Sequence, residues 1–151
     1  MSLIRPQLEY CAAVWDPHTA TSIYAIERVQ RRAARWVLHR YHNTSSVSGM
    51  LDQLNWTPLQ DRRSHSRLAL MYKINRGLVD IDPHTYLTSI TRPTRHTHQY
   101  GYLQIPAVTE AYRCSFFPRT VREWNALPLA TIISPSVASF KTQLTKLPSV
   151  I

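Results

Sequence analysis

Residues 23–40 read IYAIERVQRRAARWVLHR, a stretch in which charged and apolar positions separate when it is wound into a helix. At about 100° per residue, its basic side chains fall within an arc of roughly 100°. These side chains are Arg28, Arg31, Arg32, Arg35 and His39, and the opposite side holds Ile26, Val29, Ala33 and Val37. The pattern predicts a helix over 23–40 that turns one face to a core and the other to an anion.

Arginine is suited to a phosphate-rich partner, because its planar guanidinium group binds phosphate with two hydrogen bonds and stays charged at neutral pH. Glu27 is the only acidic residue in the stretch, whereas a solvated helix usually alternates its charges in i,i+4 pairs. We interpret this face, continued by Arg40, as a candidate contact for the backbone of RNA or DNA. A basic face that is simply solvated is the alternative.

Helical patterns also flank this stretch. Residues 3–15 have apolar side chains at helical spacing and Pro6 in the first turn, and Asp16-Pro17 would end that helix. Downstream, residues 43–45, Asn-Thr-Ser, offer capping oxygens to a short third helix. Its apolar positions are Val47, Met50, Leu51 and Leu54, with Trp56 sealing the end.

A fourth helix is predicted from residues 57–60, Thr-Pro-Leu-Gln, which have the form of a capping box with proline at the first helical position. It runs to about Asn75 and stops at Gly77, with Leu59, Leu70 and Ile74 as core positions. Its basic residues spread widely around the axis, which favours ordinary solvation. We nevertheless include three of them in the candidate nucleic-acid surface, namely Arg62, Arg63 and Arg67.

The composition of the sequence changes after Asp82, because seven of the ten prolines occur from Pro83 onward. We therefore expect a boundary near residues 79–83, between a helical region, 1–78, and a C-terminal extension, 79–151.

The extension has mixed character. Residues 100–108 and 110–117 are rich in aromatic and β-branched side chains, which predicts a short β-hairpin. A short helix is expected over 118–127, and Ser136 would cap another that carries Val137, Phe140 and Leu144. The predicted fold is mainly α: a helical, thumb-like bundle followed by a smaller proline-rich region with a short β-hairpin and two short helices.

Charge and composition narrow the class of partner. The 151 residues carry a net charge of +9, and 44% are hydrophobic, enough for one ordinary core or two small ones. Residues 1–78 hold 11 basic and 5 acidic residues, a net +6, and residues 79–151 hold 7 and 4, a net +3. No apolar run approaches the roughly 18 residues of a membrane span, and no signal-peptide core follows Met1. We expect an intracellular protein of the nucleus or cytoplasm with no membrane partner.

Residues for catalysis or metal binding are scarce. The nine acidic residues are scattered, and the only close pair, Asp80 and Asp82, is interpreted as a loop cap. Three glycines do not suffice for a phosphate-cradling loop, and no Gly-x-Ser-x-Gly elbow occurs. Cys11 and Cys114 are interpreted as reduced core thiols, and the four tryptophans as core residues. We expect no enzyme activity, metal, cofactor or small-molecule substrate.

Residues 3–17, LIRPQLEYCAAVWDP, and 27–37, ERVQRRAARWV, resemble the C-terminal thumb and post-thumb part of reverse transcriptases from jockey-like non-LTR retrotransposons. Later segments agree, so the resemblance extends over almost the entire chain. These segments are TSSV (44–47), MYKI (71–74), GLVDI (77–81), QIPA (104–107), SFFPRTV (115–121), EWNALP (123–128) and SFK (139–141).

The resemblance implies a thumb-like helical region that lies downstream of the polymerase palm and holds the RNA template and primer duplex. The sequence contains neither the Phe/Tyr-x-Asp-Asp metal motif nor the fingers and palm, so we expect no DNA synthesis by this chain alone. We expect a truncated copy, a separately read frame or a domesticated piece of such an element. The resemblance assigns no role to single arginines, whose contact with nucleic acid is inferred from charge.

Three hypotheses follow. The first is a non-catalytic fragment of an RNA-directed DNA polymerase that binds template or primer backbones, RNA or DNA, through its basic helix. The second is a protein-interaction module whose basic face packs against the missing palm and fingers or another acidic partner. The third is an inactive retroelement relic.

Overall fold

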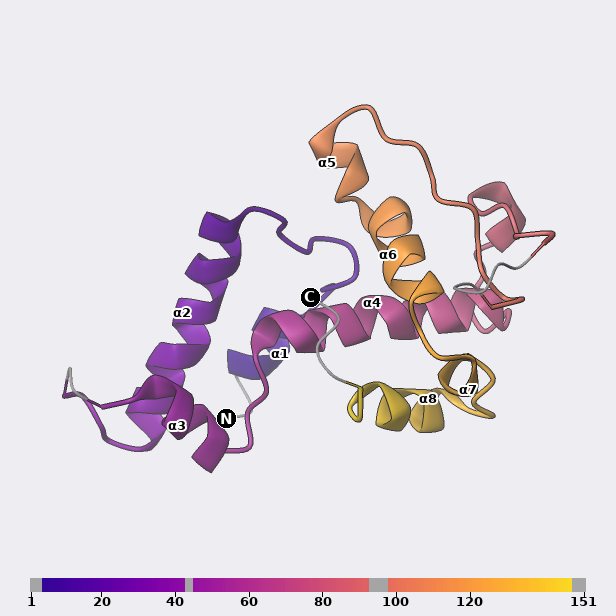
Figure 1. Ribbon diagram of the computed structural model, residues 1–151. Helices are drawn as coiled ribbons and strands as arrows, with labels where there is room; N and C mark the ends of the chain where they lie inside the picture. Colours follow the sequence, from indigo (N-terminus) through magenta and orange to yellow (C-terminus); the bar gives the residue numbers. More distant parts are fainter. Residues whose placement is uncertain (1–3, 43–44, 93–97, 148–151) are drawn as a thin grey trace. The chain divides into compact units, whose positions relative to one another are not determined.

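The computed structural model describes residues 4–42, 45–92 and 98–147, which belong to two compact units, Met1–Ser64 and His65–Ile151 (Figure 1). The first unit contains α1 (Ile4–Glu9), α2 (Ala20–Val37), α3 (Val47–Gln53) and the start of α4 (Leu59–Asn75). The second contains the rest of α4, a 3₁₀ helix η1 (Pro83–Thr85), α5 (Glu110–Arg113), α6 (Phe116–Asn125), α7 (Leu129–Ile132) and α8 (Val137–Leu144). The prediction of a mainly α fold is confirmed.

The basic helix α2 is shifted by three residues from its predicted bounds at each end. It begins at Ala20 because the Thr19 hydroxyl accepts the backbone N–H of Ser22 at 3.3 Å. It ends at Val37 because His39 takes a left-handed conformation, with φ of 51°, and the Arg40 N–H returns to the Arg35 carbonyl at 3.1 Å. His39 and Arg40 therefore follow the helix and do not extend it, which corrects the prediction.

The buried face of α2 differs in part from the predicted one. It is centred on Gln30, Ala33 and Ala34, and Ala34 packs with Met50 and Leu51 of α3 in a small core. That core also includes partly buried Leu38, Val47, Leu54 and Trp56. Val29 and Val37, which we expected on the apolar face, are exposed.

A carboxylate on α2 caps α4. Glu27 Oε2 accepts the Leu59 N–H at 3.0 Å, and the Gln30 side-chain amide donates to the Thr57 carbonyl at 3.1 Å. The Leu59 N–H, at the start of α4, thus finds its acceptor on α2, and not in the predicted capping box. Pro58 precedes the first helical residue instead of occupying it. These two bonds fix the side of α2 that faces inward.

The ends of the other helices in the first unit agree in part with the prediction from sequence. The third predicted helix is confirmed as α3, but its cap is Ser46, whose hydroxyl accepts the Gly49 N–H at 3.3 Å. Asn43 and Thr44, proposed as part of that cap, lie outside the described residues. The first helix is shorter than expected: α1 stops at Glu9 and Cys11 is left-handed, with φ of 49°.

The second unit is built around Trp124 of α6, which is 0% exposed. Phe140 of α8 lies beside it and stacks on Tyr72 of α4, with ring centroids 4.5 Å apart. Because the C-terminal half of α4 supplies such core residues, the contacts divide the chain inside α4, between residues 64 and 65. The boundary expected near residues 79–83 stays a prediction. Gly77, at φ of 63°, ends α4 as predicted.

The Asn125 side chain fixes the segment before α5. Its Oδ1 accepts the Tyr102 N–H at 3.0 Å and its Nδ2 donates to the Tyr102 carbonyl at 2.7 Å. The Trp124 indole N–H donates to the Tyr100 carbonyl at 2.9 Å. Gly101 lies between them in a tight space, since a Cβ there would lie 3.0 Å from Ile90 Cδ1 and 3.1 Å from the His98 carbonyl oxygen.

The predicted β-hairpin is wrong. Among the described residues there is no strand, only an isolated antiparallel bridge between Ser89 and Tyr102. Residues 110–117 form α5 and the start of α6, because the Thr109 hydroxyl caps α5 by accepting the Tyr112 N–H at 3.3 Å. The two predicted short helices are confirmed as α6 and α8, the latter capped by Ser136.

We expect Trp124→Ala to lower the free energy of unfolding by about 3–5 kcal/mol, because it leaves a cavity in the core of the second unit. The matched control is Trp36→Ala on α2, whose side chain is 64% exposed. It should change stability by no more than about 0.5 kcal/mol. Urea denaturation followed by circular dichroism measures both, and equal losses would contradict the described core.

Glu27→Ala should lower the free energy of unfolding by about 1–3 kcal/mol, because it leaves the Leu59 N–H without its acceptor. Glu27→Gln keeps an acceptor oxygen on a side chain of the same length and should retain most of the stability. Asp52→Ala on α3 removes an exposed carboxylate of the same unit and serves as the charge control. If Glu27→Ala costs no more than Asp52→Ala in the same denaturation experiment, Glu27 is not the cap.

Candidate nucleic-acid interface

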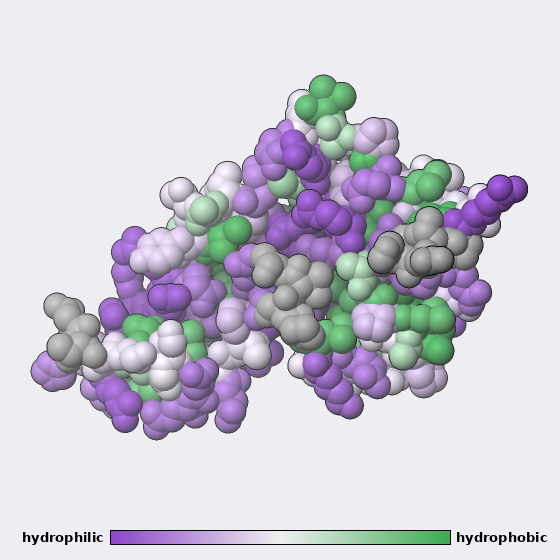
Figure 2. All heavy atoms as spheres, viewed as in Figure 1, coloured by the Kyte–Doolittle hydropathy of each residue, from purple (hydrophilic) through white to green (hydrophobic). Residues whose placement is uncertain are grey.

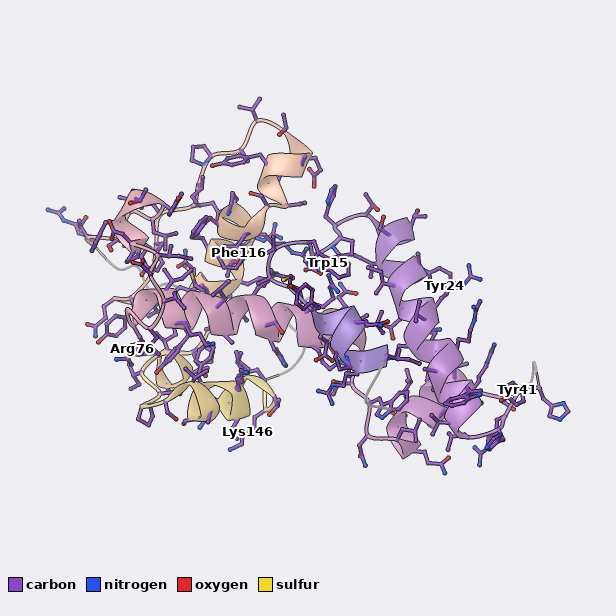
Figure 3. All side chains as sticks on the ribbon, turned by 180° about the vertical axis from the view of Figure 1, so that it is seen from behind. Trp15, Tyr24, Tyr41, Arg76, Phe116 and Lys146 are labelled. Atoms are coloured by element: carbon purple, nitrogen blue, oxygen red, sulfur yellow. The ribbon has the colours of Figure 1, made fainter. Side chains whose placement is uncertain are left out.

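Three arginines of α2 are exposed on the side opposite its buried residues: Arg28, Arg31 and Arg32. Figure 3 shows nitrogen-tipped side chains projecting from α2 on the side where Tyr24 is labelled. Hydrophilic residues cover much of the first unit in the view of Figure 2. We call Arg28, Arg31, Arg32 and Arg35 the basic face.

The basic face is not neutralised within the part of the chain that the structure describes. No carboxylate there forms an ion pair with any of its four arginines. Glu27, the only acid on α2, is turned toward the start of α4. The positive charge of Arg28, Arg31 and Arg32 is therefore directed to solvent.

Arg35 is the most enclosed member of the basic face. It is half-buried, and its Nε is shielded from solvent without a hydrogen-bond partner among the described residues. A shielded donor without an acceptor is unfavourable.

His39 and Arg40 are both exposed and lie just past the C-terminal end of α2. They extend the positive region beyond the helix. Because the chain turns at His39, helical spacing no longer fixes their direction relative to the basic face.

The arginines at the start of α4, which we also expected to contact nucleic acid, have a different environment. Arg63 is only 2% exposed, and its guanidinium group donates to Asp16 Oδ1 at 2.8 Å. It also donates to the Leu8 carbonyl at 2.6 Å and the Trp15 carbonyl at 3.0 Å, and lies 4.0 Å from the Trp15 ring centroid. Arg63 holds the end of α1 and the following turn in place.

Arg62 and Arg67 are also engaged inside the protein. Arg62 pairs with Glu9 at 3.1 Å and donates to the Gln30 side-chain oxygen. Arg67 is 1% exposed, and its Nη2 lies 2.6 and 2.9 Å from the two oxygens of Glu123. Burial lowers the pKa of both guanidinium groups, and the paired carboxylates, Glu9 and Glu123, oppose that shift. We remove Arg62, Arg63 and Arg67 from the candidate interface.

Two aromatic side chains beside the basic face were missed as candidates. Tyr24 is 58% exposed, and Trp36, which we expected in the core, is exposed as well. Trp15 is also exposed, so of the four tryptophans only Trp124 is fully buried. The spacing of Tyr24 to Arg28, Arg31 and Arg35, at i+4, i+7 and i+11, is the signal that could have identified it.

The described residues hold no cluster of metal-ligating side chains. No three His, Cys, Asp or Glu side chains gather within residues 4–42, 45–92 and 98–147. Asp82 accepts the His84 N–H at 3.0 Å and so is the loop cap that we predicted.

The cysteines are not core thiols as expected, because Cys11 is exposed and Cys114 is only partly buried. Burial, together with the neighbouring Glu110 carboxylate, raises the pKa of the Cys114 thiol. A raised thiol pKa disfavours the reactive thiolate.

None of the described helices combines the length and the apolar character that crossing a membrane requires. Comparison of the chain with known proteins gave no match to a family model, to a curated protein or to a solved structure.

Proposed function

We propose that the chain is a non-catalytic nucleic-acid-binding module that holds phosphate backbones on the basic face of α2. The observation that carries this proposal is the exposure of Arg28, Arg31 and Arg32 without an ion-paired carboxylate in the described chain. A polyanion neutralises such a row and releases its own counterions, which makes the contact favourable at moderate salt.

The contrast with α4 supports the proposal. Arg63 and Arg67 are buried beside Asp16 and Glu123, so their charge serves the fold. The arginines of α2 have no such structural partner, yet they lie on a helix whose orientation is fixed by Glu27 and Gln30. A rigid helix holds charged groups in a fixed row at low entropic cost, as a backbone-binding surface requires.

The resemblance to the C-terminal part of non-LTR retrotransposon reverse transcriptases agrees with this role. We propose that the chain is a fragment of such an RNA-directed DNA polymerase and contributes template or primer binding. In the segment EWNALP, Glu123 binds Arg67, Trp124 fills the core and Asn125 holds Tyr102. The resemblance thus falls on residues that a shared fold would need.

Contacts to phosphates alone would make binding independent of base sequence and sensitive to salt. With about four phosphates engaged, log affinity should fall against log salt with a slope of about −3 to −4. The triple change Arg28→Gln, Arg31→Gln and Arg32→Gln should weaken binding to all sequences alike and reduce the slope by about 2 to 3. Fluorescence anisotropy with labelled oligonucleotides at several salt concentrations measures both quantities.

The control removes three exposed basic residues of the second unit, Arg92→Gln, Arg122→Gln and Lys141→Gln. Both variants lose three charges, so a difference between them isolates the basic face from the general charge of the chain. Equal weakening by the two variants, or affinity that does not depend on salt, would refute the proposed interface.

A further inference from the structure

The basic face has an aromatic side chain within it. At about 100° per residue, Tyr24 lies within about 40° of Arg28, Arg31 and Arg35 around the axis of α2. Tyr24 is 58% exposed, and its side chain makes no hydrogen bond or ring contact with another described residue. Figure 3 shows Tyr24 on α2 and Tyr41, also exposed, beyond the C-terminal end of the helix. A large ring is thus placed among the arginines and not in the core.

A second ring lies at the margin of the basic face, near the C-terminal end of α2 and about 120° from Tyr24 around the helix axis. Trp36 is one helical turn from Arg32 and is 64% exposed. The twelve residues from Tyr24 to Trp36 correspond to about 18 Å along the helix axis. The arginines therefore lie between two exposed aromatic side chains, spread over a distance that several nucleotides can follow.

Phosphate contacts do not explain these rings. In a duplex the faces of the bases are stacked on each other, so a protein surface reaches mainly the backbone and the base edges in the grooves. In a single strand the bases can turn outward and stack on aromatic side chains while arginines hold the phosphates. Base stacking on a ring is tolerant of sequence, since every base has such a face.

We propose that the basic face is a binding surface for single-stranded RNA or DNA, in preference to duplex, with Tyr24 and Trp36 as stacking platforms for unpaired bases. This inference rests on the proposed function and specifies its ligand. Arg28, Arg31 and Arg35 bind successive phosphates, and the Tyr24 ring, one helical turn before Arg28, takes a base beside them. The surface binds single strands of either sugar, because stacking and phosphate contact do not require the 2′-hydroxyl.

The test measures binding of the full chain to four labelled ligands by fluorescence anisotropy. These are an oligouridine and an oligothymidine of about 12 nucleotides, an abasic strand of the same length and a duplex of the same length. The unmodified chain should bind both single strands more tightly than the abasic strand and the duplex. Tyr24→Ala should weaken single-strand binding about 5- to 100-fold and change abasic and duplex binding less than about twofold.

Two further variants make the result specific. Tyr24→Phe keeps the ring and should bind single strands within about twofold of the unmodified chain. Tyr10→Ala removes a tyrosine that is 73% exposed just after α1 and outside the basic face, and should have no effect. Circular dichroism confirms that each variant is folded.

The outcomes separate this inference from the proposed function. If Tyr24→Ala binds the single strands as the unmodified chain does, or the abasic strand and duplex bind equally well, the inference is wrong. The proposed function then stands as long as the arginine substitutions still weaken binding. If the chain binds none of the four ligands at low salt, both fail, and an acidic protein becomes the partner to test.

Discussion

Buried guanidinium groups need carboxylate partners, and this requirement determines where several acidic residues of the chain lie. A charge removed from water is strongly unfavourable unless it is paired and hydrogen-bonded. Arg63 donates hydrogen bonds to Asp16 and two backbone carbonyls, and Arg67 donates to both carboxylate oxygens of Glu123. With only nine acidic residues against eighteen basic ones, carboxylates placed inside the fold cannot also neutralise its surface.

The basic face of α2 follows from this distribution. Glu27, the one acid on α2, caps α4, and Gln30 binds the Thr57 carbonyl beside it. Both bonds turn the same side of α2 inward, so the arginines on the other side are presented to solvent. Local polar contacts thus determine the orientation of the helix, and that orientation determines which charges a ligand can reach.

The sequence predicted those features whose cause is local. The end of α4 at Gly77 and the caps of α8 and η1 each depend on residues within a few positions of the boundary. The end of α2 was missed because a histidine, not a glycine, takes the left-handed position. Arg63 was misassigned because its partner, Asp16, lies 47 residues away, and no periodicity reveals such a pair. The prediction of a β-hairpin was wrong because it rested on strand propensity, whereas the Thr109 hydroxyl caps a helix that begins at Glu110.

The two aromatic side chains beside the basic face complete the physical picture of this surface. Arginines alone would attract any polyanion, since charge does not distinguish a duplex from a single strand. An exposed aromatic ring adds a stacking contribution to the binding free energy, and this contribution requires a base whose face is not already stacked on another base. Under the proposed function, charge governs the attraction of a strand to the surface, whereas the Tyr24 and Trp36 rings distinguish a single strand from a duplex.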